Sequence, residues 1–414
     1  MPLTPTAHLH EGAECIADDL LELLAVDTQN PPGATREAID YLAAELDALG
    51  IDTEHVTIDP AKPNLLATIP GEHDTTLLLN GHLDTVPFDR EHWTHDPLGE
   101  RESERIYGRG TTDMKGAVAS ILAAARAYAE TGTTPPVTLA FAFVSDEEVG
   151  GDAGLPAVLE HGLEADACVI GESTCEAGRH SLTVADRGSI WLTLEATGAG
   201  AHGSRPVLGD NAIDRLYAGI QTLREEFGGR PLECAAPVQA IVDESVEYYG
   251  PIMGEETART LFQHPSINLG TIEGGTAINA VPESATARLD LRLAPGVNTP
   301  DVIEEIRTCA ESCEGVTVAD VSWSIGTYLD LDEPVVSAVR DTAESVTGER
   351  VYRRSATGGG DAKTLRNAGI PTVEFAVGTD TVHADDEYTT VDILRANAVV
   401  YTRLPEAYAA ALGG

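Results

Sequence analysis

Short apolar runs separated by helical stretches constrain the fold of this chain more than any other feature. Five such runs span 64–69, 76–80, 137–144, 167–170 and 372–376. Each is mostly apolar, as strands buried on both faces of a sheet are. Helical spacing of apolar residues lies between several of them, most clearly over 114–129. This alternation predicts an α/β fold with a mostly parallel central sheet and helices on both faces.

The middle of the chain has a different pattern. Apolar and polar side chains alternate over 182–196, 266–272 and 285–293. Such alternation predicts antiparallel strands, and the helical spacing over 212–227 adds a helix. We therefore expect a smaller α+β domain over 181–295, inserted into a larger domain that comprises 1–180 and 296–414. The stretch 228–265 has weak periodicity, and no element is predicted there.

Acidic residues far outnumber basic ones in this chain of 414 residues. There are 68 Asp and Glu against 26 Lys and Arg, which gives a formal net charge of −42. No nucleic acid and no membrane is expected as a partner, because anionic partners are bound by clustered cations. The acids are dispersed, and only Lys62, Lys115 and Lys363 are lysines. This composition resembles that of halophilic proteins, in which salt screens self-repulsion; an ordinary acidic cytosolic protein is the alternative.

The cysteines and the first residues bear on the compartment. Six cysteines are scattered along the chain without a CxxC pair, and we expect all of them to be reduced. Residues 1–25 lack the basic segment and the apolar segment of a secretory signal. No apolar run approaches the ~18–20 residues that span a membrane. We therefore expect a cytoplasmic protein.

The first candidate site residues follow the run at 76–80. His82 and Asp84 come shortly after it, and ligand sites in α/β proteins lie at the carboxyl ends of strands. His82 is therefore placed where a metal ligand could lie, with Asp84 as the group that orients its ring. Taken alone, the two residues fit a surface-loop histidine beside a capping carboxylate better than a metal site.

Carboxylates occur at comparable positions elsewhere. Asp113 follows a glycine-rich turn and begins a helix, where helix capping is the alternative role. Glu147 and Glu148 follow the run at 137–144 together with Asp146. Carboxylates this close repel one another unless a cation lies among them, although a solvated loop would also tolerate them.

Glu172 and His383 complete the set, each after a further predicted strand. Their convergence with the earlier residues at one sheet edge predicts a metal site. Mixed imidazole and carboxylate ligands suit Zn²⁺, with Co²⁺ or Mn²⁺ as alternatives. Two ions ~3.5–4 Å apart, bridged by a carboxylate and a water, would lower the pKa of that water. A spare carboxylate would then accept its proton.

Five segments with these residues occur in a recognisable order, and they span 81–87, 108–116, 145–151, 171–173 and 383–387. They resemble the motifs of the co-catalytic di-zinc deacylase and peptidase family. That family includes acetylornithine deacetylase, succinyl-diaminopimelate desuccinylase, aminoacylase and bacterial carboxypeptidase G. The resemblance covers nearly the whole chain, and it implies a di-metal catalytic domain with an inserted domain that dimerises and acts as a lid.

The resemblance also implies metal-binding roles for individual residues. His82 and Glu172 correspond to the ligands of one ion, and Glu148 and His383 to those of the other. Asp113 corresponds to the carboxylate that bridges the two ions.

Catalytic and substrate-binding roles follow from the same resemblance. Glu147 corresponds to the general base and Asp84 to the residue that orients the histidine ligand. His202 matches an inserted-domain histidine that crosses a dimer interface and stabilises the oxyanion; a plain loop residue is the alternative. Asn279 and Arg292 match substrate contacts, and the guanidinium of Arg292 suits a substrate carboxylate. A surface-strand arginine is the alternative there.

One segment departs from the family pattern. Family members often carry Gly-Gly-Thr-Ser-Asp or Gly-Gly-Thr-Asp before a late helix, whereas this chain has Gly358-Gly359-Gly360-Asp361. Gly359 is the candidate substrate contact there, although the hydroxyl is missing.

These residues predict a zinc-dependent hydrolase that cleaves the amide bond of a small N-acyl amino acid. Succinyl-diaminopimelate desuccinylase and acetylornithine deacetylase have the most similar pattern. A dipeptidase or carboxypeptidase, which would act on a dipeptide or peptide, is the alternative within the family. A non-catalytic metal-binding sensor or scaffold is the alternative outside it, and the presence of Glu147 argues against it. A homodimer is expected.

Overall fold

A computed structural model describes residues 4–11 and 13–413 of the chain. Within the N-terminal stretch 1–25, residues 1–3 and 12 lie outside this description. The chain divides into two compact units. Unit 1 contains the chain up to Val184, Leu329–Arg354 and the chain from Gly360 onward; unit 2 contains Ala185–Tyr328 and Ser355–Gly359.

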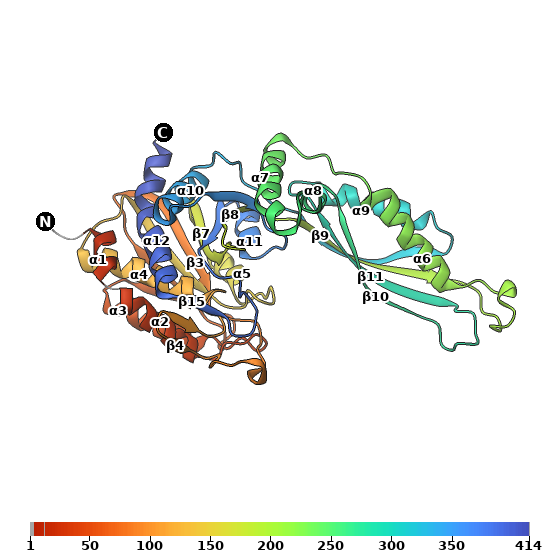
Figure 1. The fold of residues 1–414 in the computed structure, drawn as a ribbon, viewed down its shortest axis with the longest axis horizontal. Helices are drawn as coiled ribbons and strands as arrows, with labels where there is room; N and C mark the ends of the chain where they lie inside the picture. The colour runs from red at the N-terminus through yellow and green to blue at the C-terminus, as the bar shows by residue number, and fades with distance from the viewer. Residues whose placement is uncertain (1–3, 12, 414) are drawn as a thin grey trace. The chain divides into compact units, whose positions relative to one another are not determined.

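Unit 1 is built on an eight-stranded sheet with the order β1-β2-β6-β3-β7-β14-β8-β13. Figure 1 labels β3, β7 and β8 of this sheet. The four central strands are parallel, because β3 pairs in parallel with β6 and β7, and β7 pairs in parallel with β14. β2 and β8 extend this centre as antiparallel strands. The strands are β1 (Thr53–Val56), β2 (Asn64–Ile69), β3 (His73–His82), β6 (Val137–Val144), β7 (Ala167–Ser173), β8 (His180–Ala185), β13 (Val351–Ser355) and β14 (Thr372–Ala376).

Helices cover both faces of this sheet. Leu78 of β3 and Ile170 of β7 pack in one apolar cluster with residues of α5 and α11. The neighbouring positions Gly81 and Gly171 point to the opposite face, where an added Cβ would lie 2.8 Å from a side chain of α4. These two glycines therefore let α4 approach the carboxyl ends of β3 and β7. The helices of unit 1 are α1 (Pro5–Glu11), α2 (Ala13–Ala25), α3 (Arg36–Ala48), α4 (Lys115–Thr131), α5 (Leu155–His161), α10 (Pro334–Thr347), α11 (Asp361–Asn367) and α12 (Val391–Leu412).

A small second sheet in unit 1 joins two distant loops. It consists of β4 (Glu100–Glu102), β5 (Arg105–Tyr107) and β15 (Tyr388–Thr390) in the order β15-β5-β4. β5 and β15 are antiparallel, with Tyr107 opposite Tyr388. The segment that follows β5 therefore lies beside the segment that precedes β15.

Unit 2 is an antiparallel sheet covered on one face by helices. The strand order is β10-β11-β9-β12, and α6 and α9 pack their apolar faces on the sheet. The elements are β9 (Gly188–Thr197), α6 (Ala212–Leu223), α7 (Ala236–Met253), α8 (Glu255–Gln263), β10 (Ser266–Gly274), β11 (Ser284–Leu293), α9 (Thr299–Glu311) and β12 (Val316–Ser324).

The predicted fold class is confirmed, and each run predicted as a strand contains one, whereas β1, β12 and β13 were not predicted. The stretch 228–265, for which no element was predicted, contains α7 and α8. α7 has a proline near each end, Pro237 and Pro251, and the second directly follows Gly250. Both residue types usually mark turns, so the helical signal of this stretch is weak.

The observed units do not follow the predicted limits of the inserted domain, 181–295. Strand β8 belongs to the large sheet of unit 1, whereas α9 and β12 belong to unit 2. The reason is pairing: β12 runs antiparallel to β9, with Val316 opposite Ala196. α9 buries Val302 and Ile306 in the same core. The strand that completes a sheet cannot be assigned from its own residues alone.

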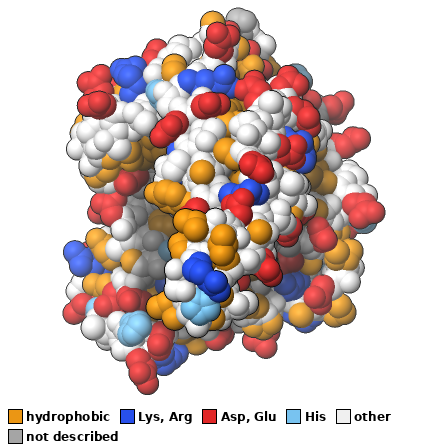
Figure 2. Space-filling view, turned by 90° about the vertical axis from the view of Figure 1, so that its right-hand side faces the viewer, with side chains coloured by type: hydrophobic (Ala, Val, Ile, Leu, Met, Phe, Trp, Pro, Cys, Tyr) orange, Lys and Arg blue, Asp and Glu red, His pale blue; other side chains and the backbone are white. Residues whose placement is uncertain are grey.

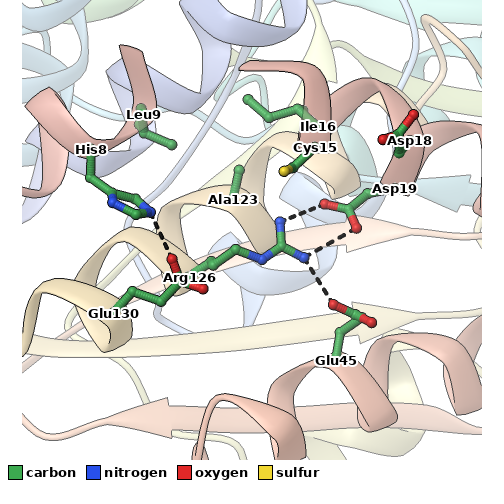
Figure 3. Close-up of a pocket in the computed structure, with 10 residues that line it drawn as sticks. All are labelled: His8, Leu9, Cys15, Ile16, Asp18, Asp19, Glu45, Ala123, Arg126 and Glu130. Atoms are coloured by element: carbon green, nitrogen blue, oxygen red, sulfur yellow. Dashed lines mark hydrogen bonds and ion pairs between the residues drawn. The ribbon is translucent and has the colours of Figure 1, made fainter. Parts of the chain in front are cut away.

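A cavity of about 480 Å³ lies among the first four helices, and Figure 3 shows the side chains that line it. Arg126 of α4 forms a two-fold ion pair there with Asp19, at 2.7 and 3.1 Å, and contacts Glu45 at 3.0 Å. The side chains of Arg126 and Asp19 are only 15% and 7% exposed. The contacts of Arg126 with Asp19 and Glu45 therefore hold α2 and α3 against α4.

Replacing Arg126 with Met is expected to lower the free energy of unfolding by about 3–5 kcal/mol, because Asp19 would remain as a buried charge without its partner. Urea unfolding at constant KCl measures this. The same substitution at Arg101, whose partner Glu14 is 71% exposed, should change stability by less than about 1 kcal/mol. Equal effects of the two substitutions would contradict the expectation.

Among the residues that the structure describes, no helix is both long enough and apolar enough to cross a membrane.

Candidate metal centre

Unit 1 brings five of the predicted site residues together at the carboxyl edge of its sheet. His82 is the last residue of β3, and Glu172 lies near the end of its neighbour β7. Glu148 and His383 lie in the segments that follow β6 and β14. Asp113 lies just before α4, the helix that can pack close to this edge because Gly81 and Gly171 have no side chain.

Asp113 lies between the two histidines. Its Oδ1 is 3.2 Å from Nε2 of His82, and its Oδ2 is 2.9 Å from Nε2 of His383. Glu172 Oε1 lies 3.0 Å from Nε2 of His82, and Glu148 Oε2 lies 3.6 Å from Nε2 of His383. In each three-residue group the donor atoms lie within 4.8 Å of one another. The arrangement is two adjacent groups of three donors that share one carboxylate.

The donor set fits a pair of divalent cations. Among the described residues, Asp113 Oδ1 is a buried oxygen that accepts no hydrogen bond, although the imidazole of His82 is close to it. A cation between these atoms would give the oxygen a partner. One imidazole and two carboxylates in each group are ligands that Zn²⁺ accepts.

The buried acidic side chains at this edge also favour the binding of cations. Burial raises the pKa of Glu147 to about 9 and, together with the charge of Asp113, that of Glu172 to about 8. Hydrogen bonds to Asp113 and Glu148 raise the pKa of His383 to about 10. Protons thus stabilise this cluster of acids when no metal is bound, and divalent ions would replace them.

The ring of His82 is oriented by the backbone two residues further along the chain. Its Nδ1 lies 3.0 Å from the backbone carbonyl of Asp84, whereas the nearer carboxylate oxygen of Asp84 is 3.6 Å away. A proton on Nδ1 would leave the lone pair of Nε2 for a metal. The Asp84 carboxylate instead accepts the backbone N–H groups of Glu147 and Glu148, both at 3.1 Å, and Nδ2 of Asn30 at 2.8 Å. Asp84 therefore holds the loop that carries both glutamates.

Glu147 interacts electrostatically with His82, Glu172 and Asp113, but it belongs to neither metal-ligand group. An added Cβ at Gly360 would lie 2.6 Å from Glu147 Oε1, so a side chain there would displace that carboxylate. Gly359, the predicted substrate contact, is the preceding residue; it is exposed, and its role stays a prediction.

The remaining predicted site residues lie in unit 2. His202 is in an exposed loop, where its Nδ1 lies 2.8 Å from Oγ of Ser204. Asn279 is exposed, and its carbonyl accepts the N–H of Gly203 at 2.7 Å. Arg292 on β11 is half-buried and forms an ion pair with Asp290 at 2.9 Å. The structure thus gathers His202 and Asn279 in neighbouring loops, and their roles remain predictions.

Two residues at the site had been given no role from the sequence. The first is Asn30, whose Nδ2 donates to the carboxylates of Asp84 and Asp146 at 2.8 and 3.0 Å. Glu387 lies in the fifth motif, and its carboxylate faces the loop before Asp113. Its position four residues after His383, within the same motif, was the sequence feature that could have indicated a role at the site.

This fold and this set of donors are those of a metal-dependent amidohydrolase. Residues 78–407 match the peptidase family M20/M25/M40. The chain therefore belongs to that family.

Individual relatives agree with this assignment. The chain is 30% identical over 400 residues to a succinyl-diaminopimelate desuccinylase of Acidiphilium cryptum, covering 94% of this chain and 96% of that protein. It is 28% identical over 406 residues to aminoacylase-1 of Sus scrofa, covering 94% of each. Its fold is similar to that of an M20 family metallo-carboxypeptidase from Sulfolobus solfataricus, with a TM-score of 0.76, 21% identity and coverage of 94% and 98%.

Proposed function

We propose that this protein removes the acyl group from a small N-acyl amino acid, using two Zn²⁺ ions. The observation that carries the proposal is the pair of donor groups that share Asp113, with the carboxylate of Glu147 beside them. The relatives named desuccinylase and aminoacylase support an acyl amino acid as the substrate. Arg292 is the proposed partner of the substrate carboxylate, with Asn279 and Gly359 as further substrate contacts.

His82, Glu172, Asp113, Glu148 and His383 are the proposed ligands. When bound, the two ions would polarise the amide carbonyl and lower the pKa of the attacking water. Glu147 accepts the proton of that water and donates it to the leaving amine. Asp84 keeps the base in place through the N–H of Glu147.

A substrate panel tests the proposal. Purified protein is assayed at molar KCl against N-succinyl and N-acetyl amino acids and against dipeptides, with and without a chelator. We expect deacylation that the chelator abolishes and Zn²⁺ restores. Cleavage of dipeptides alone would favour a peptidase. A protein that binds metal but turns over no substrate would favour the non-catalytic sensor or scaffold.

We further propose that the protein is a homodimer in which His202 acts on the partner's substrate. The loops around His202 expose large apolar side chains: Val207 is 90% exposed, Leu208 69%, and Ile278 is fully exposed. Exposed apolar patches of this kind mark interaction surfaces. The Gly203–Asn279 hydrogen bond holds these loops together.

Replacing His202 with Ala is expected to lower kcat by about 10²–10³-fold, as the loss of an oxyanion donor does, with metal content unchanged. Mixing His202→Ala chains with Glu147→Gln chains should restore activity. In the mixed dimer, one site would combine an intact base with the partner's intact histidine. Absence of recovery in mixtures shown to contain mixed dimers would contradict the role across the interface.

Replacing Gly360 with Ala is expected to lower kcat by about 10²-fold, because the added methyl would displace the carboxylate of Glu147. Gly358→Ala is the matched control, since an added Cβ there meets no described atom within 4 Å. Steady-state kinetics and metal analysis of both variants check this. Similar kcat values for the two variants would show that Gly360 does not constrain the base.

We also propose a salt-rich, reducing cytoplasm as the environment. The face in Figure 2 carries acidic side chains spread among neutral ones, with fewer basic ones. The six cysteines are all free thiols in the structure. Both observations fit a halophilic cytoplasmic protein, whose repulsion between acids is weakened by salt.

A further inference from the structure

A buried ion pair lies behind the proposed metal ligands. Arg109 Nη1 donates to Glu387 Oε2 over 2.7 Å, and the two side chains are only 3% and 0% exposed. Neither residue belongs to the donor groups. Because removing two charges from water is costly, a pair this deep is retained only where additional hydrogen bonds stabilise it.

Glu387 supplies such bonds to the loop that carries Asp113. Its Oε1 accepts the backbone N–H of Thr112 at 2.7 Å and that of Asp113 itself at 3.2 Å. The N–H of Gly110 lies 3.2 Å from both carboxylate oxygens. Three amides directed at one carboxylate fix the backbone of this loop, and with it the position of the Asp113 side chain.

Arg109 reaches the loop that carries His383. Its Nη2 donates to the carbonyl of His383 at 3.3 Å, and its guanidinium lies 5.3 Å from the ring centre of Trp93. His383 has a φ of 61°, a left-handed conformation that residues other than glycine adopt only when their surroundings hold them. The carbonyl of Glu387 also accepts the N–H of Gly108 at 2.9 Å.

We propose that the Arg109–Glu387 pair positions Asp113 and His383, so that binding of the second ion, the one held by Asp113, Glu148 and His383, depends on this pair. The inference rests on the proposed function, since it presupposes the two ions. Arg109 and Glu387 are positioning residues: they contact the backbone of the ligands and belong to neither donor group.

Zn²⁺ titration in competition with a chromophoric chelator tests this. The wild-type chain should bind two ions. Arg109→Met and Glu387→Gln should bind the first with little change and the second about 10–100-fold more weakly, as expected when the residues that support metal ligands are altered. When the titration is repeated with Co²⁺ in place of Zn²⁺, the visible absorption that appears on binding of the second Co²⁺ ion should differ from wild type in both variants.

Arg126→Met is the matched control. It removes the arginine of another buried ion pair of unit 1, at the helical cavity, and no residue of that pair contacts the ligands. It should lower stability toward urea yet bind two ions with wild-type affinity. A second ion weakened as much in Arg126→Met as in Arg109→Met would overturn the proposal, because general destabilisation would then explain both.

Second-ion affinities equal to wild type in Arg109→Met and Glu387→Gln would overturn this inference alone. A wild-type chain that binds no ion would overturn the proposed function and this inference with it. If Arg109→Met and Glu387→Gln fail to fold, the affinity of Arg109→Lys for the second ion tests the proposal instead. This variant keeps the positive charge but loses the donor to the His383 carbonyl. Weaker binding of the second ion there supports the proposal, and unchanged binding overturns it.

Discussion

Replacing Glu147 with Gln is expected to lower kcat by about 10²–10⁴-fold, the range that a general base supplies, while both ions stay bound. Gln keeps the size of the side chain but cannot take a proton. Burial raises the pKa of Glu147 to about 9 in the metal-free protein, and nearby cations would lower it toward the working range. Steady-state kinetics with the preferred substrate, together with metal analysis, check this.

Glu148→Gln is the natural comparison, because the two residues are adjacent and only Glu148 belongs to a donor group. Glu148→Gln should lose turnover and affinity for one ion together. Glu147→Gln should lose turnover alone. A Glu147→Gln protein with wild-type kcat would remove this residue from the mechanism.

Three of the five proposed ligands could be predicted from a local rule. His82, Glu148 and Glu172 directly follow apolar runs, and parallel strands bring their carboxyl ends to one edge. The central sheet follows from the same runs. Asp113 and His383 needed the resemblance as well, because a helix-capping carboxylate and a loop histidine have no distinct local pattern.

The supporting contacts could not be predicted, because they join loops that are far apart in the sequence. Asn30 meets Asp84 across 54 positions, and Arg109 meets Glu387 across 278. No periodicity encodes such a pairing. The limits of unit 2 were missed for the same reason, since β12 belongs to it only through its pairing with β9.

Removing the ions with a chelator is expected to abolish turnover and to make the protein less stable as the pH rises from about 5 to about 9. The pKa of Glu147 is raised to about 9 and that of Glu172 to about 8, from ordinary values of 4.5. The pKa of His383 is raised to about 10 from 6.5. In this window the folded chain binds more protons than the unfolded one, so its stability falls with rising pH. Asp113 has a lowered pKa and loses its contribution only below this window, as the pH falls.

Bound Zn²⁺ should reverse this trend. Metal binds deprotonated ligands, so the stabilisation by Zn²⁺ grows as the pH rises, and the gap between loaded and metal-free protein widens. Urea unfolding at constant KCl, at about pH 6 and about pH 9, with chelator or with excess Zn²⁺, measures this. The metal-free Glu147→Gln protein should show a weaker pH dependence, because one of the titrating carboxylates is gone. Metal-free stability that stays level or rises over this range would contradict the crowding of buried acids from which the metal site is inferred.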